Sequence, residues 1–212
     1  MTRYGFAPDD LGPINLSPNE MMFWLYCPIS LPGLWVRQLP ANLRQFRPIV
    51  DAVHSDSGER KWDESYVYLT VKTLFITPEN PGNRPGWHSD GFLTDDINYI
   101  WYDSEPTLFW VASDPVHLPA DHQESMTRME SLSKRCGDIV SFPCKHLLRL
   151  DQSHIHRVAD ISTSGVRTFI KVSVSRHLYG QIGNSINHGL DYQRPKFHRT
   201  AIRNCPATPP HS

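Results

Sequence analysis

Residues 66–77 read YVYLTVKTLFIT, and this stretch decides the fold class. It is dense in β-branched and aromatic residues, which predicts a long strand. The following residues 78–86, PENPGNRPG, contain three prolines and two glycines and end that strand. Downstream, short apolar segments separated by turn residues predict further strands at 87–92, 98–102, 107–112, 138–142, 147–150, 154–159 and 166–174. Many short strands separated by turn residues predict a mainly β protein of the sandwich or jelly-roll type.

The N-terminal part has a different pattern. A short helix is predicted near Asn19, in NEMMFWLY, and a second at 41–53, where apolar residues recur at helical spacing. Residues 121–134 fit either a helix or an irregular excursion. We therefore expect one domain over residues 1–212. It has helical and loop support in 1–64, a jelly-roll core in 66–175 and a C-terminal extension in 176–212 with a loose end.

The bulk composition narrows the possible partners. The net charge is −1 and the pI about 6.8, without a basic stripe, so we expect a small-molecule substrate and no nucleic acid. The N-terminal residues lack a signal-peptide pattern, and the apolar runs are too short to span a bilayer. These two observations predict a cytoplasmic location and no membrane partner. The four cysteines, Cys27, Cys136, Cys144 and Cys205, form no CxxC pair and are expected to be reduced thiols.

The sequence WHSDGF, residues 87–92, carries the strongest chemical signal. His88 and Asp90 are two residues apart, a spacing that places both side chains on one face of a strand. A second histidine is available in HIHRV, where His156 competes with His154. Two histidines and one carboxylate leave three coordination positions open, as in the facial triad of non-haem iron(II) enzymes. Arg167, at the start of the next strand, is suited to pair with a ligand carboxylate.

Taken in order, these residues resemble the 2-oxoglutarate/iron(II)-dependent dioxygenases. That family has an H-x-D motif, a distal His well downstream and an Arg or Lys on the following strand. Here the matching positions are His88-Ser89-Asp90, His156 and Arg167, and GDIVSFP ahead of the distal His also looks like the family. The resemblance covers about residues 66–175. It implies a double-stranded β-helix core, cupin-like, with a few flanking N-terminal helices.

The resemblance also implies a chemistry. Fe(II) would be held by His88, Asp90 and His156, and 2-oxoglutarate by Arg167. With O₂, the enzyme would hydroxylate a small molecule and release succinate and CO₂. In one departure from the family, Arg167 is followed by Thr168 and Phe169. The residue that would make the second hydrogen bond to the co-substrate is therefore unassigned, and Ser173 and Tyr68 are the candidates.

Other residues are candidates for the substrate pocket. These are Trp87, which precedes the first metal ligand, the loop residues Asn83 and Arg84, the neighbouring His154, and Lys171, which is also the reserve for Arg167. An alternative is a cupin-like metal-dependent isomerase or a ligand-binding protein without 2-oxo acid chemistry. A jelly-roll module with no catalytic role is a third class. The substrate, the outcome of the oxidation and the oligomeric state stay open.

Overall fold

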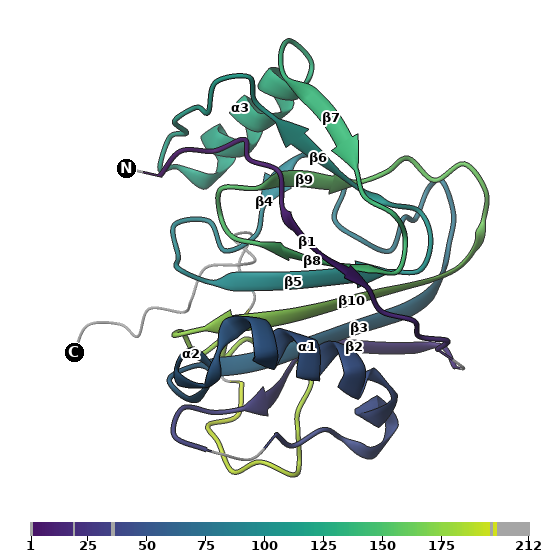
Figure 1. The fold of residues 1–212 in the computed structure, drawn as a ribbon, viewed down its shortest axis with the longest axis vertical. Helices are drawn as coiled ribbons and strands as arrows, with labels where there is room; N and C mark the ends of the chain where they lie inside the picture. The colour runs from purple at the N-terminus through teal and green to yellow at the C-terminus, as the bar shows by residue number, and fades with distance from the viewer. Residues whose placement is uncertain (1, 19, 35–36, 196, 199–212) are drawn as a thin grey trace.

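The computed structural model describes residues 2–18, 20–34, 37–195 and 197–198, and it consists mainly of two antiparallel sheets (Figure 1). This confirms the mainly β class. The first sheet has six strands, in the order β1 (Asp9–Pro13), β8 (His146–Leu150), β5 (Ile97–Tyr102), β10 (Gly165–Ser175), β3 (Tyr66–Ile76) and β2 (Met22–Ser30). The second has four, in the order β4 (His88–Ser89), β9 (Ile155–Val158), β6 (Thr107–Val111) and β7 (Asp138–Ser141).

Strand β3 pairs with β10 and β2 and is buried on both faces over most of its length. Its residues Val67, Leu69 and Val71 belong to the largest apolar cluster. Thr70 and Lys72, on the alternate face, line a pocket between the two sheets. Burial on both faces explains why apolar and aromatic residues occupy consecutive positions in 66–69 and 74–76 rather than strictly alternating with polar ones.

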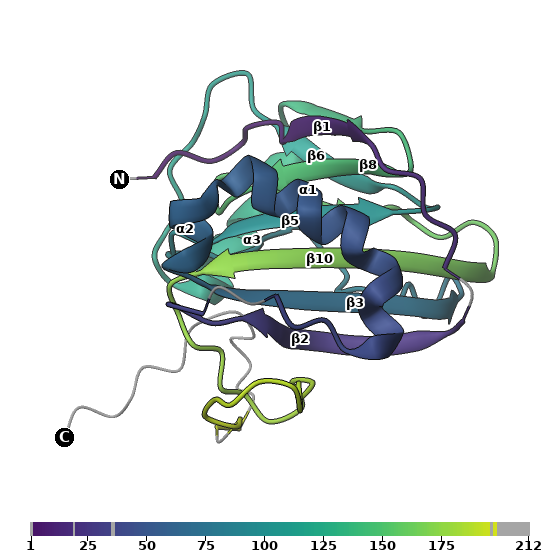
Figure 2. The same ribbon diagram turned by 60° about the horizontal axis from the view of Figure 1, so that its bottom comes forward.

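Three helical segments cover the outer face of the six-stranded sheet, as Figure 2 shows. They are the 3-10 helix η1 (Ala41–Phe46), α1 (Arg47–Ser57) and the short α2 (Glu59–Asp63). The helix predicted at 41–53 is thereby confirmed. Its first part is a 3-10 helix, and α1 starts next to Pro48, whose missing N–H suits the first turn of an α-helix. Leu43, Phe46 and Val50 from these helices pack on the sheet.

The helix predicted near Asn19 is wrong for the residues that the structure describes. From Met22 onward this segment forms strand β2, which pairs antiparallel with β3; Asn19 itself lies outside the described residues. The edge of β3 offers unpaired backbone groups, and pairing with them outweighs a weak helical pattern. Residues 1–64 therefore do more than support the core, because β1 and β2 extend the six-stranded sheet at its two edges. The tail predicted to be loose also lies largely outside the described residues.

The uncertain segment 121–134 forms a helix, α3 (His122–Ser133), which lies beside the four-stranded sheet (Figure 1). Its buried residues include Met129, which joins a second apolar cluster with Trp110 and Ile155. Asp121 starts the helix, because its carboxylate accepts a hydrogen bond from the Glu124 backbone N–H at 2.8 Å.

We expect Asp121→Ala to lower the free energy of unfolding by about 1 kcal/mol, because it removes this N-terminal cap. Asp121→Asn keeps an acceptor oxygen and should lie within a few tenths of a kcal/mol of the wild type. Urea denaturation followed by circular dichroism measures both. Equal losses in the two variants would contradict a capping role.

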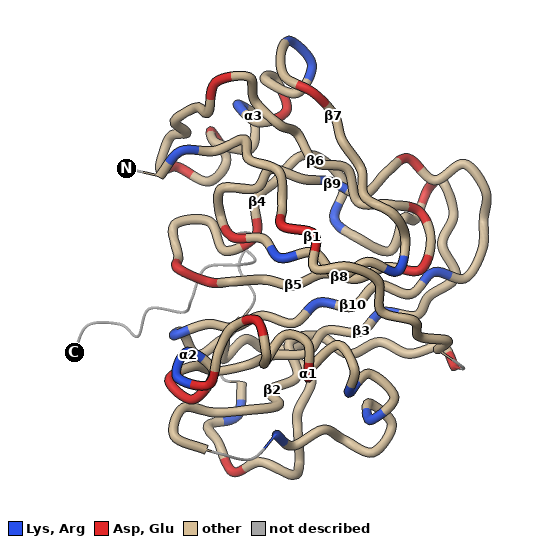
Figure 3. Tube along the Cα trace, in the orientation of Figure 1, with Lys and Arg blue, Asp and Glu red and all other residues tan. Residues whose placement is uncertain are grey.

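Charged residues of both signs are spread along the described part of the trace, as Figure 3 shows. Among the described residues, no helix combines the length and apolar character needed to cross a bilayer.

Candidate metal centre

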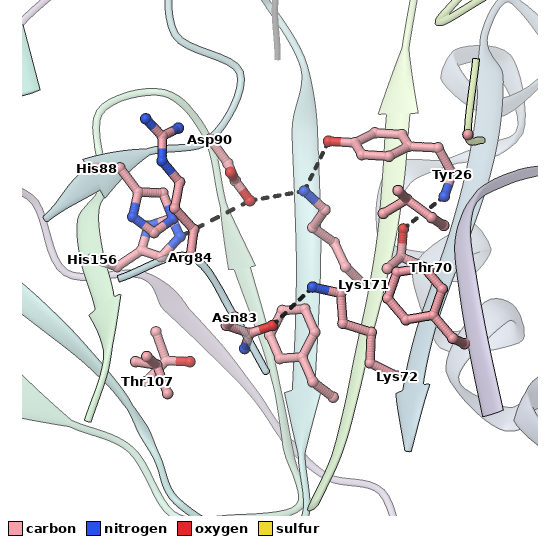
Figure 4. Close-up of a pocket in the computed structure, with 15 residues that line it drawn as sticks. Tyr26, Thr70, Lys72, Asn83, Arg84, His88, Asp90, Thr107, His156 and Lys171 are labelled. Atoms are coloured by element: carbon pink, nitrogen blue, oxygen red, sulfur yellow. Dashed lines mark hydrogen bonds and ion pairs between the residues drawn. The ribbon is translucent and has the colours of Figure 1, made fainter. Parts of the chain in front are cut away.

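A cavity of about 390 Å³ opens between the two sheets, within the size range of small-molecule sites. Figure 4 shows that its walls come from both sheets and from the loop that precedes β4. The side chains and backbone that line it belong to Phe23, Leu25, Tyr26, Thr70, Lys72, Asn83, Arg84, His88, Asp90, Thr107, His156, Val158, Phe169, Lys171 and Gly183. All three predicted metal ligands are thus in the same pocket.

Strand pairing brings the two histidines together. His88 on β4 and His156 on β9 are direct cross-strand partners, and their ring centroids are 4.6 Å apart. Asp90 reaches them differently from the prediction, because β4 ends at Ser89 and Asp90 lies in the turn that follows. Gly91 makes that turn with φ +68°, and a Cβ there would meet Thr94 Oγ1 at 3.0 Å. A tight turn, rather than an extended strand, therefore directs the carboxylate.

The hydrogen bonds of the two imidazoles define which nitrogen is available for a metal. His88 Nδ1 donates to the Gly86 carbonyl at 2.9 Å, and His156 Nδ1 donates to the His154 carbonyl at 3.1 Å. Since a carbonyl oxygen only accepts, each Nδ1 carries a proton and each neutral ring presents a bare Nε2. His156 Nε2 lies 3.9 Å from Asp90 Oδ2, and one potential ligand atom from each of the three residues lies within 4.8 Å of the others.

The protonation states also suit a metal. Burial, together with the neighbouring His156, lowers the pKa of His88 to about 3, and burial lowers the pKa of His156 as well. Both rings are therefore neutral near pH 7. For Asp90, burial alone would raise the pKa, but the positive charge of Lys171 outweighs the effect of burial and holds the pKa below its ordinary value. The site thus offers two neutral imidazoles and one carboxylate, the charge states that metal binding requires.

The buried Lys171 and the half-buried Tyr26 form a polar pair beside the carboxylate. Lys171 Nζ donates to Asp90 Oδ2 at 2.9 Å and to Tyr26 Oη at 3.0 Å (Figure 4). Burial would lower the pKa of Lys171, but Asp90 raises it above its ordinary value. Burial raises the pKa of Tyr26. Both groups therefore carry a proton at neutral pH.

The sequence analysis missed Tyr26. Its backbone has φ +47° at an irregularity of β2, where the pairing with β3 shifts between Trp24 and Cys27. A bulky residue rarely adopts that conformation, and β-bulges commonly redirect a side chain near a functional site. No local pattern in NEMMFWLY signals such a bulge, because it is set by pairing with β3, which is distant in the sequence.

The predicted pocket residues divide into two groups. Asn83, Arg84 and Lys171 line the cavity. Trp87 instead packs in an apolar cluster, with the Arg157 guanidinium 5.4 Å from its ring. His154 accepts a hydrogen bond from the Asp151 backbone N–H and, through Nε2, donates to the Ala7 carbonyl at 3.2 Å. Its hydrogen bond to Ala7 therefore holds the N-terminal segment in place, and the side chain does not line the cavity.

Arg167 does not reach the cavity. Its Nε donates to the carbonyls of Ser104 and Glu105, at 2.9 and 3.0 Å, and its guanidinium lies over the rings of Tyr102 and Phe169. It is absent from the described pocket lining. The two candidates for a second co-substrate contact are also engaged elsewhere: Ser173 Oγ donates to Asn98 Oδ1, and Tyr68 Oη to the His177 carbonyl.

No family model and no curated protein matches the chain. It is similar to three solved L-ribose isomerases: that of Geodermatophilus obscurus, that of Acinetobacter sp. DL28 in complex with L-ribose, and that of Cellulomonas parahominis with L-psicose. The identities are 15%, 15% and 14%, and the TM-scores 0.35, 0.33 and 0.33. The matches cover 70%, 69% and 70% of this chain and 60%, 57% and 59% of those chains. TM-scores of this size assign neither substrate nor activity.

The prediction of a 2-oxoglutarate-dependent dioxygenase is corrected, because the residue predicted to hold the co-substrate does not line the cavity. The physical reason lies in Arg167, since the predicted co-substrate site depended on its guanidinium and backbone carbonyls hold that group away from the cavity. The structure therefore shows a mainly β protein. Three of its side chains could hold a metal ion in a pocket whose volume suits a small molecule.

Proposed function

We propose that this chain is a cupin-like, metal-dependent isomerase that rearranges a small oxygen-rich molecule without oxidising it. The observation that carries the proposal is the convergence of His88, Asp90 and His156 in one pocket, with both Nε2 atoms unprotonated. Two imidazoles and one carboxylate suit a divalent first-row transition metal, Fe(II) among them. When bound, that metal would supply a Lewis acid for a carbonyl or hydroxyl oxygen of the ligand.

The strand order supports a double-stranded β-helix core. Strands β3, β5, β8 and β10 belong to one sheet, and β4, β6, β7 and β9 to the other, so the chain crosses repeatedly between the sheets. Cupins belong to the jelly rolls, in which two sheets are built from eight strands in this crossing manner. The histidines lie on the inner side of the second sheet, opposite β10 and β3 of the first.

The chain's own residues contribute proton donors. Lys171 Nζ and Tyr26 Oη hold protons next to Asp90, and both line the pocket. Isomerisation of a hydroxy-carbonyl compound moves protons between neighbouring atoms, so donors at the metal end of the pocket can hydrogen-bond the oxygen on which negative charge develops. Phe169, Val158 and Leu25 add apolar side chains to the lining.

A second candidate is a ligand-binding protein that uses the same metal without turnover. The observation that favours it is that Asp90 is the one carboxylate in the described lining, and its Oδ2 already accepts from Lys171. The pocket residues described here therefore include no second carboxylate to accept a proton from carbon.

The metal claim is tested on metal-free protein by titration with Mn²⁺, Fe²⁺, Co²⁺, Ni²⁺ and Zn²⁺ and by metal analysis after gel filtration. We expect one ion per chain. His88→Ala and His156→Ala should each weaken binding by about 100-fold or more, since even partners outside the first shell contribute about 10–100-fold. The exposed His117 provides the matched control, and His117→Ala should bind as the wild type does. Absence of stoichiometric binding would overturn the proposal.

Turnover is tested with the metal-loaded protein in D₂O by proton NMR. A panel of aldoses and ketoses, L-ribose included, and their phosphates and acids serves as substrates. An isomerase that moves a proton between carbons exchanges the hydrogen next to the carbonyl for deuterium while product appears. Metal-dependent binding with neither product nor exchange across the panel would favour the ligand-binding protein instead.

A further inference from the structure

Three tyrosine rings from distant parts of the chain pack against one another. Tyr26 lies on β2, Tyr68 on β3, and Tyr179 in the C-terminal segment that follows β10. The ring centroids of Tyr26 and Tyr179 are 5.4 Å apart, those of Tyr68 and Tyr179 5.5 Å, and those of Tyr26 and Tyr68 5.9 Å, with the ring planes tilted or edge-on. These separations and orientations are those of attractive aromatic pairs. We call these three residues the tyrosine cluster.

The tyrosine cluster is connected to Asp90 through Lys171. Lys171 Nζ donates to Tyr26 Oη at 3.0 Å and to Asp90 Oδ2 at 2.9 Å (Figure 4). The backbone of Tyr26, with φ +47°, has a conformation that a bulky residue keeps only where its surroundings fix it. The rings of Tyr68 and Tyr179 belong to those surroundings. The cluster therefore fixes Tyr26, and Tyr26 in turn fixes the ammonium that holds the carboxylate.

A second route leads from Tyr179 to the same carboxylate. Tyr179 Oη donates to Asp96 Oδ2, and Ser175 Oγ donates to Asp96 Oδ1 at 2.5 Å. Asp96 is 3% exposed, so this carboxyl group is held inside the protein by its two hydroxyl partners. Residues 90–96 form the loop between β4 and β5, with Asp90 as the first residue and Asp96 as the last. Tyr179 thus holds one end of the loop whose other end is Asp90.

Hydrogen bonds inside this loop extend the constraint to its first residue. The Asp96 backbone N–H donates to Thr94 Oγ1 at 3.3 Å. Thr94 donates to the Gly91 carbonyl from its backbone N–H at 2.8 Å and from Oγ1 at 2.7 Å. Gly91 packs so closely that a Cβ on it would lie 3.1 Å from Asp96 Cβ, and its turn directs the Asp90 side chain. Both routes therefore lead from Tyr179 to Asp90.

We infer that Tyr179 is a positioning residue of the metal centre, which fixes the Asp90 carboxylate along these two routes. This inference rests on the proposed function, because it treats Asp90 as a metal ligand. Tyr179 is 5% exposed and does not belong to the described pocket lining, so it acts through Tyr26 and Asp96 rather than by touching the metal or its ligand. The C-terminal segment after β10 thereby contributes to the site, although its sequence pattern gave no sign of this.

The test titrates Co²⁺ into metal-free protein and follows its visible absorption, which depends on the number and arrangement of the ligand atoms. Tyr179→Phe keeps the ring and removes the hydrogen bond to Asp96. We expect it to weaken Co²⁺ binding by about 10-fold, the lower end of the effect of residues outside the first shell, and to alter the spectrum of the saturated site. Tyr66→Phe is the matched control. The Tyr66 ring stacks on Tyr68 at 6.3 Å, and its hydroxyl makes none of the contacts above, so both quantities should equal those of the wild type.

Two results would overturn the inference. One is wild-type affinity with the wild-type spectrum in Tyr179→Phe. The other is lower affinity with the wild-type spectrum at saturation, because a loss of stability alone leaves the ligand arrangement unchanged. If Tyr179→Phe does not fold, Ser175→Ala takes its place under the same two criteria, since it removes the other hydroxyl donor to Asp96.

A double-mutant cycle in the metal-free protein separates this inference from the proposed function. Urea denaturation with a chelator present compares Tyr179→Phe, Asp90→Ala and the double variant. We expect non-additive losses, because side chains coupled through shared contacts do not contribute independently. Additive losses with one bound Co²⁺ in the wild type refute the positioning role alone. Non-additive losses in a wild type that binds no Co²⁺ refute the metal centre alone and leave Tyr179 as the residue that positions Asp90.

Discussion

Asp90→Ala lowers the free energy of unfolding of the metal-free protein by about 3–5 kcal/mol, the usual cost of leaving a buried charge without its partner. Asp90 and Lys171 are 8% and 7% exposed, and their charged atoms are 2.9 Å apart. Removing the carboxylate leaves the Lys171 ammonium buried with the neutral Tyr26 hydroxyl as its remaining acceptor among the contacts above. Urea denaturation in the presence of a chelator measures the loss without any contribution from bound metal.

A double-mutant cycle shows whether the loss comes from the ion pair. Lys171→Met removes the charge and keeps most of the side-chain length, so the double variant Asp90→Ala/Lys171→Met contains no buried charge at this point. We expect its loss to be clearly smaller than the sum of the two single losses, because apolar replacements of buried ion pairs are often tolerated. Additive losses, or a cost below about 1 kcal/mol for Asp90→Ala alone, would show that water already solvates the pair.

Trp101→Ala produces the second large effect, a loss of about 3–5 kcal/mol, because the substitution leaves a cavity in the main apolar cluster. Trp101 is fully buried in that cluster. Its Nε1–H also donates to the carbonyls of Ile14 and Lys145, at 2.9 and 3.0 Å, and so holds the N-terminal segment against the turn before β8. The variant therefore loses both packing and a shared hydrogen bond.

Trp101→Phe separates these two contributions. It keeps an aromatic ring in the cluster but leaves the two carbonyls without their donor, for which we expect a loss of about 1–3 kcal/mol. Phe75, which is 54% exposed on β3, is the matched aromatic control, and Phe75→Ala should change stability by no more than about 0.5 kcal/mol. Chemical denaturation followed by far-UV circular dichroism measures all three. Equal losses for Trp101→Phe and Trp101→Ala would place the whole effect in the hydrogen bonds.

The strands of the core were predictable because their signal is local. The long strand at 66–77, the short strands from residue 98 onward and the helix at 41–53 all show residue patterns that the structure reproduces, whereas the strand predicted at 87–92 is reduced to His88–Ser89. The helix expected near Asn19 failed because β2 is stabilised by the edge of β3, and that partner is not visible in the local pattern. The spacing of His88 and Asp90 likewise implied a strand through both residues, but β4 ends at Ser89 and Gly91 makes a turn.

The amino-acid sequence by itself determined the mainly β class and singled out His88, Asp90 and His156, since strand propensity and ligand type are properties of short segments. The tertiary structure decided which groups surround them. Sheet register paired His88 with His156, a bulge turned Tyr26 toward Lys171, and the start of β10 placed Arg167 against the carbonyls of Ser104 and Glu105. Each of these outcomes depends on contacts between residues far apart in the chain, and one residue's shift in register or one bulge redirects a side chain to another face.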